Sequence, residues 1–182
     1  MVPIALLLLF FADVAAARTT PELPFQQWGA CPTECCRYGP WRANSSVTAR
    51  TAPGARNVAF SIARGERVDA LTGVVITREA GVVVLERPYT VESKSGGNVT
   101  LPANARVYVL HNGGEGVDSV WYRGATYRAE LYATAVSAAT AAYPRRVLSV
   151  PRYEWWVKVR NGRGKVGWVR DPLDFLGQGE CG

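Results

Sequence analysis

The chain has very few of the side chains on which enzymes usually depend. It contains one histidine, His111, and four cysteines among 182 residues. No cysteine and histidine spacing matches a standard zinc site, because three cysteines lie together near the amino terminus, far from His111. A Cys–His pair for nucleophilic catalysis is also disfavoured, since a cysteine in a disulfide has no thiolate. We therefore expect a protein that is not an enzyme, with no metal and no other cofactor.

Long apolar runs are also scarce. The apolar segment over residues 4–11 is well short of the roughly 20 residues needed to cross a bilayer. Ala15-Ala16-Ala17 follows it, and such small residues are typical of a signal-peptidase site. We expect a signal peptide over residues 1–17, with cleavage before Arg18 and no membrane span in the rest of the chain. The alternative, an uncleaved anchor, is disfavoured by Asp13 as well as by the length.

Dense runs of one charge are absent, although the chain is basic. Its formal charge is +6, and without residues 1–17 it has 21 basic and 14 acidic residues, a charge of +7. The arginines are scattered, which favours a solvated basic surface over a dedicated polyanion site. A basic exported protein can still associate with anionic envelope polymers. Nucleic acid is not an expected partner.

The composition favours strands over helices. Glu, Lys and Gln are sparse, whereas Val, Thr, Tyr and Trp are frequent and are separated by 18 glycines and 11 prolines. Alternating apolar residues predict a strand over 58–62, and turns are expected at 64–66 and 79–81, which together indicate a meander. The clearest hairpin joins 153–160 to 165–169 through the turn residues Asn161-Gly162-Arg163-Gly164. We predict an all-β protein.

Two stretches interrupt the strand pattern. Residues 92–98 form a polar break, and the Ala-rich stretch within 133–150 is compatible with a short helix or a linker, so an internal boundary is expected near one of them. The Gly-rich stretch 111–116 lacks the strand-to-helix setting of a phosphate-binding loop. Its glycines are better explained by a tight connection, and His111 is interpreted there as a polar turn residue.

The four cysteines predict two disulfides in an oxidising compartment. A bridge between adjacent Cys35 and Cys36 is disfavoured, because bridged Cα atoms normally lie about 4.4 to 6.8 Å apart. We expect one of these two to pair with Cys181 and the other with Cys31, and the sequence does not choose between the two pairings. The long bridge would tie the cysteine-rich segment 18–46 to the other end of the chain. It would stabilise the fold by about 4 to 5 kcal/mol on the chain-entropy model.

Several of these motifs resemble a known family. The hairpin residues Trp156, Lys158-Val159-Arg160, Asn161-Gly162 and Gly167-Trp168-Val169 are similar to the last strands of the bacterial Src-homology-3-like (SH3-like) domain. The stretch 63–73 looks like the Gly-Glu-x-Val turn and strand of that domain. Further similarity to exported bacterial proteins that carry this barrel and have no assigned activity lies in Gly29-Ala30-Cys31, Glu34-Cys35-Cys36, Gly114-Glu115-Gly116, Trp121-Tyr122-Arg123-Gly124 and the segment from Asp174-Phe175 to Cys181.

The resemblance implies a small β-barrel over residues 47–182. The chain between Leu85 and Tyr153 is longer than any loop in a plain barrel. We therefore expect either one SH3-like barrel with a strand-bearing insertion or two barrels in tandem.

Aromatic residues are the main candidates for a binding site. If Trp155 faces the core with Val157, then Trp156 lies on the opposite face with two basic side chains, which suits a glycan or an anionic peptide. The competing interpretation is that the tryptophans of the hairpin all pack in the core or between domains. The predicted ligand-binding residues are Trp156, Lys158, Arg160 and Tyr122.

The combined expectation is a non-catalytic binding module in the periplasm or outside the cell. Its partner would be peptidoglycan, another envelope polymer or an envelope protein. An alternative is a structural or inhibitory envelope protein without a small ligand. A cell-wall hydrolase is less favoured, because no spacing marks an acid–base pair among His111 and the carboxylates Glu115, Asp118, Asp171 and Asp174.

Overall fold

The computed structural model describes residues 18–33, 35–114, 116–131 and 145–179. Within these ranges the protein has fifteen strands and no helix, so the all-β prediction is confirmed. The strands are β1 (Phe25–Trp28), β2 (Gly39–Ala43), β3 (Val47–Arg50), β4 (Val58–Ile62), β5 (Arg67–Glu79), β6 (Gly81–Leu85), β7 (Tyr89–Ser93), β8 (Asn98–Leu101), β9 (Arg106–Asn112), β10 (Asp118–Tyr122), β11 (Ala125–Ala129), β12 (Arg145–Ser149), β13 (Arg152–Asn161), β14 (Val166–Arg170) and β15 (Phe175–Leu176). The predicted signal peptide and the Ala-rich stretch 133–142 lie outside the described residues.

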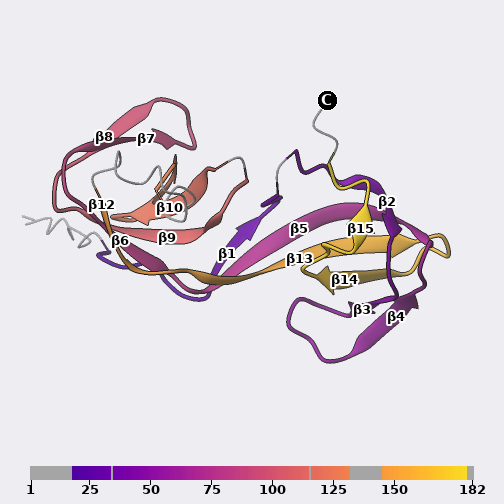
Figure 1. Ribbon diagram of the computed structural model, residues 1–182. Coiled ribbons are helices and arrows are strands. Elements are labelled where there is room, and N and C mark those ends of the chain that lie inside the picture. The colour runs from indigo at the N-terminus through magenta and orange to yellow at the C-terminus, as the bar shows by residue number, and fades with distance from the viewer. Residues whose placement is uncertain (1–17, 34, 115, 132–144, 180–182) are drawn as a thin grey trace, which may run out of the picture.

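The strands form two curled, antiparallel sheets (Figure 1). Sheet A has the order β15-β2-β5-β13-β14-β3-β4, and β1 also pairs with β5. Sheet B has the order β12-β6-β9-β10-β11-β7-β8. All strands of sheet B lie between β5 and β13 in the sequence, so this sheet is inserted into the chain of sheet A. The structure thus has a strand-bearing insertion, and the inserted strands make a second curled sheet.

A long two-stranded ribbon connects the sheets. Only Ala80 separates β5 from β6, and only Val150 and Pro151 separate β12 from β13. Because β5 pairs with β13 and β6 with β12, both strands cross from one sheet to the other side by side (Figure 1). The turn expected at 79–81 is therefore wrong, since the chain continues in its direction there. The polar break 92–98 lies at the β7–β8 hairpin, within sheet B.

Gly81 allows the ribbon to pass between the sheets. A Cβ atom at this position would lie 2.8 Å from Cδ of Pro151 and 3.0 Å from the carbonyl oxygen of Ser149. Such contacts are too short for any other residue without a shift of the backbone. The glycine that we interpreted as part of a turn thus allows two strands to approach each other closely.

Each sheet has its own apolar core. In sheet A the core includes Trp41, Ile62, Val75, Trp155, Val157, Val159 and Phe175. In sheet B it includes Val83, Leu85, Leu101, Val107, Val109, Val120 and Leu131. The cysteine-rich segment 18–46 is part of sheet A, because β1 and β2 pair with β5 and Trp41 is fully buried.

The predicted hairpin over 153–169 is confirmed by pairing of β13 with β14. Its turn is held by Asn161, whose Oδ1 accepts hydrogen bonds from the backbone N–H groups of Arg163 (3.1 Å) and Lys165 (3.0 Å). Gly164 has a φ of +77°, a conformation that favours glycine. The local sequence was therefore sufficient to predict this element.

The two sheets also touch along a seam beside the ribbon. Contacts between described residues cross it: the Thr77 hydroxyl donates to the Leu110 carbonyl (2.9 Å), the Ser119 hydroxyl donates to Oε1 of Gln27 (2.8 Å), and the rings of His111 and Tyr153 lie 5.8 Å apart. The seam is thus partly polar.

Candidate functional site

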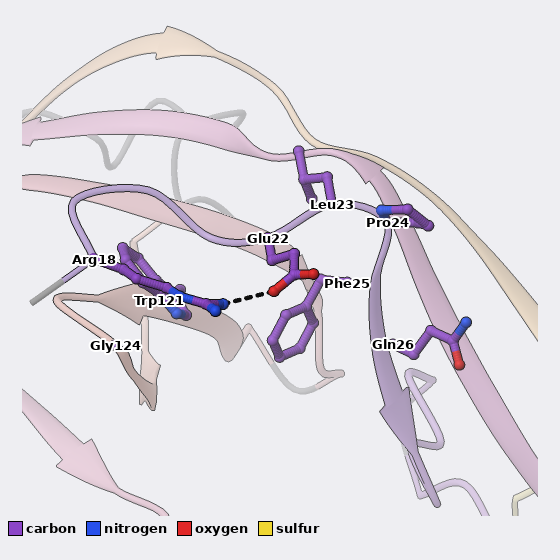
Figure 2. A pocket seen from close by; sticks show the side chains of 8 residues that line it. All are labelled: Arg18, Glu22, Leu23, Pro24, Phe25, Gln26, Trp121 and Gly124. Atoms are coloured by element: carbon purple, nitrogen blue, oxygen red, sulfur yellow. Dashed lines mark hydrogen bonds and ion pairs between the residues drawn. The ribbon is translucent and has the colours of Figure 1, made fainter. Parts of the chain in front are cut away.

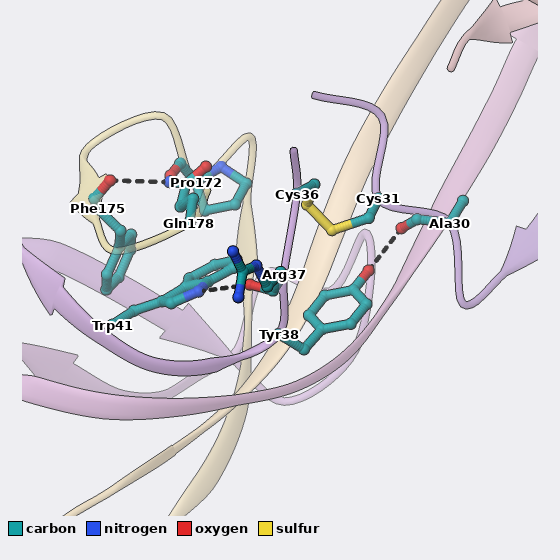
Figure 3. The surroundings of a disulfide bond; sticks show 9 residues. All are labelled: Ala30, Cys31, Cys36, Arg37, Tyr38, Trp41, Pro172, Phe175 and Gln178. Carbon is teal, nitrogen blue, oxygen red and sulfur yellow. Dashed lines mark hydrogen bonds between the residues drawn. A yellow bond between two sulfur atoms is a disulfide. The ribbon is translucent and has the colours of Figure 1, made fainter. Parts of the chain in front are cut away.

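One disulfide joins Cys31 to Cys36 (Figure 3). Their Cα atoms are 5.5 Å apart, and this bridge is one of the two that the sequence left open. Cys35 is also disulfide-bonded, and Cys181, its remaining predicted partner, lies outside the described residues. The Cys31–Cys36 bond indicates an oxidising compartment. It leaves none of the described cysteines as a free thiol.

The residues around this disulfide are held by hydrogen bonds to one another (Figure 3). The Tyr38 hydroxyl donates to the Ala30 carbonyl at 2.5 Å, and burial raises the pKa of this hydroxyl. The Trp41 indole donates to the Arg37 carbonyl at 2.9 Å. Nearby, the Gln178 amide donates to the carbonyls of Pro172 and Phe175. These bonds anchor β2 and the chain around β15 and leave little room for a ligand.

The register of β13 places three predicted site residues on one face of sheet A, the face opposite its core. Trp156, Lys158 and Arg160 alternate with the core residues Trp155, Val157 and Val159. We call this the outer face. Lys158 is half-buried, and Arg160 is exposed, with Nη2 3.0 Å from Oδ2 of Asp69. The structure thus brings the hairpin residues together as predicted.

Trp156 fits the competing interpretation, in which the tryptophans of the hairpin are packed, because the residue is only 5% exposed. It packs with Val74, Ile76 and Trp168 in a small apolar cluster, and its indole N–H donates to Oε2 of Glu154 at 3.0 Å. Side chains of the neighbouring strands β5 and β14 cover the ring. The expectation that Trp156 offers an open stacking surface is therefore wrong. Its ring is buried and packs against its neighbours.

Tyr122 belongs to the other sheet. It lies on β10, half-buried against the core of sheet B, with the Arg123 guanidinium 5.3 Å from its ring centre. It therefore lies on a different strand and sheet from the three hairpin residues, and the structure gives no contact between them.

A groove of about 420 Å³ runs along the outer face beside Trp156. Four arginines and, among the described lining residues, one carboxylate form its charged wall: Arg50, Arg56, Arg78, Arg170 and Glu154. The carboxylate of Glu154 lies 3.5 Å from Nη2 of Arg78 and 3.7 Å from Nη2 of Arg170. Within the groove one carboxylate therefore faces four guanidinium groups.

The carboxylate of Glu154 is held in its charged form. The hydrogen bond from the Trp156 indole lowers its pKa most. Burial is the next largest effect and raises it, and the guanidinium groups of Arg170 and Arg78 lower it further. Arg170 also contacts Oδ2 of Asp171 at 3.1 Å. Arg50 and Arg56 form no ion pair with any other described residue, although Nη1 of Arg50 donates to the Arg56 carbonyl. Positive charge remains in excess.

Trp28 adds an exposed aromatic ring to the outer face, and the sequence analysis missed it. The register aligns Trp28, Val74, Trp156 and Arg170 in one row across four strands. The ring of Trp28 lies 5.9 Å from that of Trp168, at 73°, and its residue is 60% exposed. No local signal identifies it, because β1 is only four residues long and its partners are distant in sequence.

A second hollow lies where residues 18–26 pack beside Trp121 (Figure 2). Its volume is about 470 Å³, and Arg18 and Glu22 form an ion pair of 2.6 Å across its mouth. Both side chains are exposed, so the pair contributes little to stability. This hollow offers less charge than the arginine groove.

His111 is buried in the seam and is not the turn residue we expected. It lies on β9, is 2% exposed, and its Nδ1–H donates to the Asn112 carbonyl at 2.7 Å. Burial lowers its pKa most, and the charge of Lys94 lowers it further, against the effect of the Asn112 bond. Nε2 is shielded from solvent and has no hydrogen-bond partner among the described residues. A shielded, neutral imidazole is a poor group for catalysis.

Two of the acidic residues considered for a hydrolase have structural contacts. Oδ2 of Asp118 accepts the backbone N–H of Leu131 at 3.0 Å, and Oδ1 of Asp171 accepts that of Trp155 at 3.1 Å. Glu115 lies outside the described residues. Within the part of the chain that the structure describes, no three His, Cys, Asp or Glu side chains are grouped as metal ligands.

Comparisons with protein-family models, with curated proteins and with solved structures each give no match. The described residues also contain no helix with the length and hydrophobicity of a membrane span. The assignment of function therefore depends on the geometry of the outer face.

Proposed function

We propose that the protein is a non-catalytic binding module of the bacterial cell envelope, exported to the periplasm or the cell exterior, that holds an anionic envelope polymer on the outer face of sheet A. The arginine groove carries this proposal, because four guanidinium groups share one groove with the carboxylate of Glu154. The resemblance of the β13–β14 hairpin to bacterial SH3-like domains belongs to the same proposal. The Cys31–Cys36 disulfide supports the oxidising location.

Guanidinium groups suit this role chemically. Their planar N–H groups bind carboxylate and phosphate oxygens in pairs, and they remain charged at any physiological pH. A single exposed ion pair contributes at most about 1 kcal/mol, so one such contact would bind weakly. A polymer that engages several arginines at once gains from multivalency. The groove is therefore better suited to a repeating polyanion than to a small acid.

Co-sedimentation with purified cell wall, and titration with a soluble polyanion, test the proposal. The double substitution Arg78→Gln/Arg170→Gln should weaken binding about tenfold at low salt, because two charged contacts are lost. Raising the ionic strength should lower the affinity of the wild-type protein toward that of the variant.

The matched control is Arg64→Gln/Arg106→Gln, which removes the same charge from exposed positions outside the groove. We expect it to change affinity less than about twofold. Equal losses in both double variants would contradict the groove as the binding site, and no binding by the wild-type protein would contradict the function itself. Thermal unfolding of each variant confirms that it is folded.

A further inference from the structure

Trp28 is the large aromatic side chain that the outer face leaves most open. Tryptophan normally buries 150 to 250 Å² in a core or an interface (as a rough range), yet Trp28 is 60% exposed. By contrast, Trp156 and Trp168 on the same face are almost fully buried. The ring of Trp28 contacts Trp168, which packs with Trp156 at the wall of the arginine groove. An exposed aromatic ring in such a place is a feature typical of a ligand contact.

The ring of Trp28 is held in place while exposed. Trp28 pairs with Val74, and the next residue, Gly29, donates its backbone N–H to the Gly73 carbonyl at 2.8 Å. The edge contact with Trp168 sets the two rings 73° apart. In such a T-shaped pair at least one face of the Trp28 ring is unused by Trp168. A fixed ring with an open face binds a flat partner at a small entropic cost.

The row places an aromatic ring and a guanidinium group on one face of the sheet. Trp28 and Arg170 are separated by three strand-to-strand steps, from β1 through β5 and β13 to β14. At about 4.8 Å a step the backbone positions would be roughly 14 Å apart in a flat sheet. The side chains lie closer, because the Trp28 ring is 5.9 Å from the ring of Trp168, which is on the same strand as Arg170. The ligand thus needs a flat apolar surface at one end of the row and an anionic group at the other.

Two classes of polymer meet this demand. Acidic polysaccharides have pyranose rings, whose C–H face is apolar and flat, together with carboxylates at intervals. Single-stranded nucleic acids have stacking bases and phosphates. The Cys31–Cys36 disulfide favours the first class, because it indicates an oxidising compartment outside the cytosol. Polypeptide polyanions such as polyglutamate have the charge without the ring.

We infer that the ligand of the outer face is an acidic polysaccharide, with a sugar ring stacked on Trp28 and carboxylates bound by Arg78 and Arg170. This inference rests on the proposed function and specifies its substrate class. Trp28 then provides selectivity for sugar rings, while the arginines supply the charge-dependent part of the affinity.

Binding isotherms with three probes of similar length test the inference: polygalacturonate, polyglutamate and single-stranded polydeoxythymidine. The full-length exported protein should bind polygalacturonate about fivefold more tightly than polyglutamate at equal ionic strength. Trp28→Ala should remove this preference and leave polyglutamate binding unchanged. Trp28→Phe, which keeps an aromatic face, should retain most of the preference.

Three results would overturn the inference. The first is equal affinity of the wild-type protein for polygalacturonate and polyglutamate. The second is a Trp28→Ala variant, folded by its thermal midpoint, that loses both polymers equally. The third is tighter binding of polydeoxythymidine than of polygalacturonate. Failure of every polyanion to bind is a separate result, which would refute the proposed function as well.

Discussion

The side chain of His111 illustrates how burial sets the chemistry of a single residue. The ring is enclosed between the sheets, next to Tyr153, and its Nδ1–H is used by the Asn112 carbonyl. Nε2 is then left as an acceptor without a partner among the described residues, and the neighbouring charge of Lys94 also opposes protonation. A histidine that looks like a turn residue in sequence is therefore a neutral component of the seam.

This environment predicts a pH dependence of stability. The folded pKa of His111 lies below its ordinary value of 6.5, so the unfolded state binds more protons as the pH falls below 6.5. Stability should be level above that value and fall as the pH is lowered toward the folded pKa. Urea denaturation between pH 8 and pH 5 measures the slope.

His111→Gln is the control for this prediction, because His111 is the single histidine of the chain. The variant should have a flatter profile between pH 6.5 and 5. An identical slope in both proteins would show that the imidazole does not determine it.

Trp156 and Trp28 predict opposite effects of one kind of substitution. Trp156→Ala removes a ring that is 5% exposed and should lower the free energy of unfolding by about 3 to 5 kcal/mol. Trp28→Ala removes a ring that is 60% exposed and should cost less than about 1 kcal/mol while weakening ligand binding. Denaturant titration of both variants distinguishes a tryptophan that stabilises the fold from one that contacts a ligand. Similar losses of stability would contradict the burial that the structure assigns to them.

At the scale of elements, the ribbon of β5–β6 and β12–β13 determines the architecture. In sheet A, β5 continues directly into β6 of sheet B and β13 continues directly from β12 of sheet B, and at Gly81 Pro151 comes too close for a side chain. The insertion of sheet B into the chain of sheet A therefore depends on a residue without a side chain at position 81.

Substitution of Gly81 tests this dependence. Gly81→Val should destabilise the protein by about 1 to 3 kcal/mol, since the new side chain meets Pro151 and the Ser149 carbonyl. Gly162→Ala is the matched control, because a Cβ there has no atom within 4 Å. It should change stability by less than about 0.5 kcal/mol. A neutral Gly81→Val would show that the ribbon tolerates a wider crossing.

The elements predicted best are those whose signals are local. The hairpin over 153–169 has its alternation and its turn residues within one short stretch, and both were correct. At 79–81 the same reasoning failed, because whether a glycine makes a turn or a close approach depends on Pro151, some 70 residues away. Trp28 was missed for a similar reason, since β5 and β14 determine its surroundings. Alternation placed Trp156 on the right face, but its burial depends on Val74 and Ile76 of β5, which are distant in sequence.

At the scale of the whole molecule, the disulfides should contribute unequally. Cys31 and Cys36 close a loop of only a few residues, which the chain-entropy model values at about 2 kcal/mol. A bridge from Cys35 to Cys181 would close most of the chain and is valued at about 4 to 5 kcal/mol. Cys35→Ala/Cys181→Ala should therefore destabilise more than Cys31→Ala/Cys36→Ala in denaturant titration.

A non-reducing peptide map of the native protein checks the pairing that this comparison assumes. We expect one peptide pair containing Cys31 with Cys36 and another containing Cys35 with Cys181. Recovery of Cys181 as an alkylated thiol would contradict the long bridge, and with it the unequal contributions.

The location of the binding site is tested most directly by titrating the isotopically labelled protein with polygalacturonate and following its ¹H–¹⁵N spectrum. We predict that the indole signal of Trp28 and the backbone signals of β1, β13 and β14 shift, while those of sheet B stay unchanged. Shifts concentrated in sheet B or along the seam, with the Trp28 indole unmoved, would contradict an anion-binding outer face.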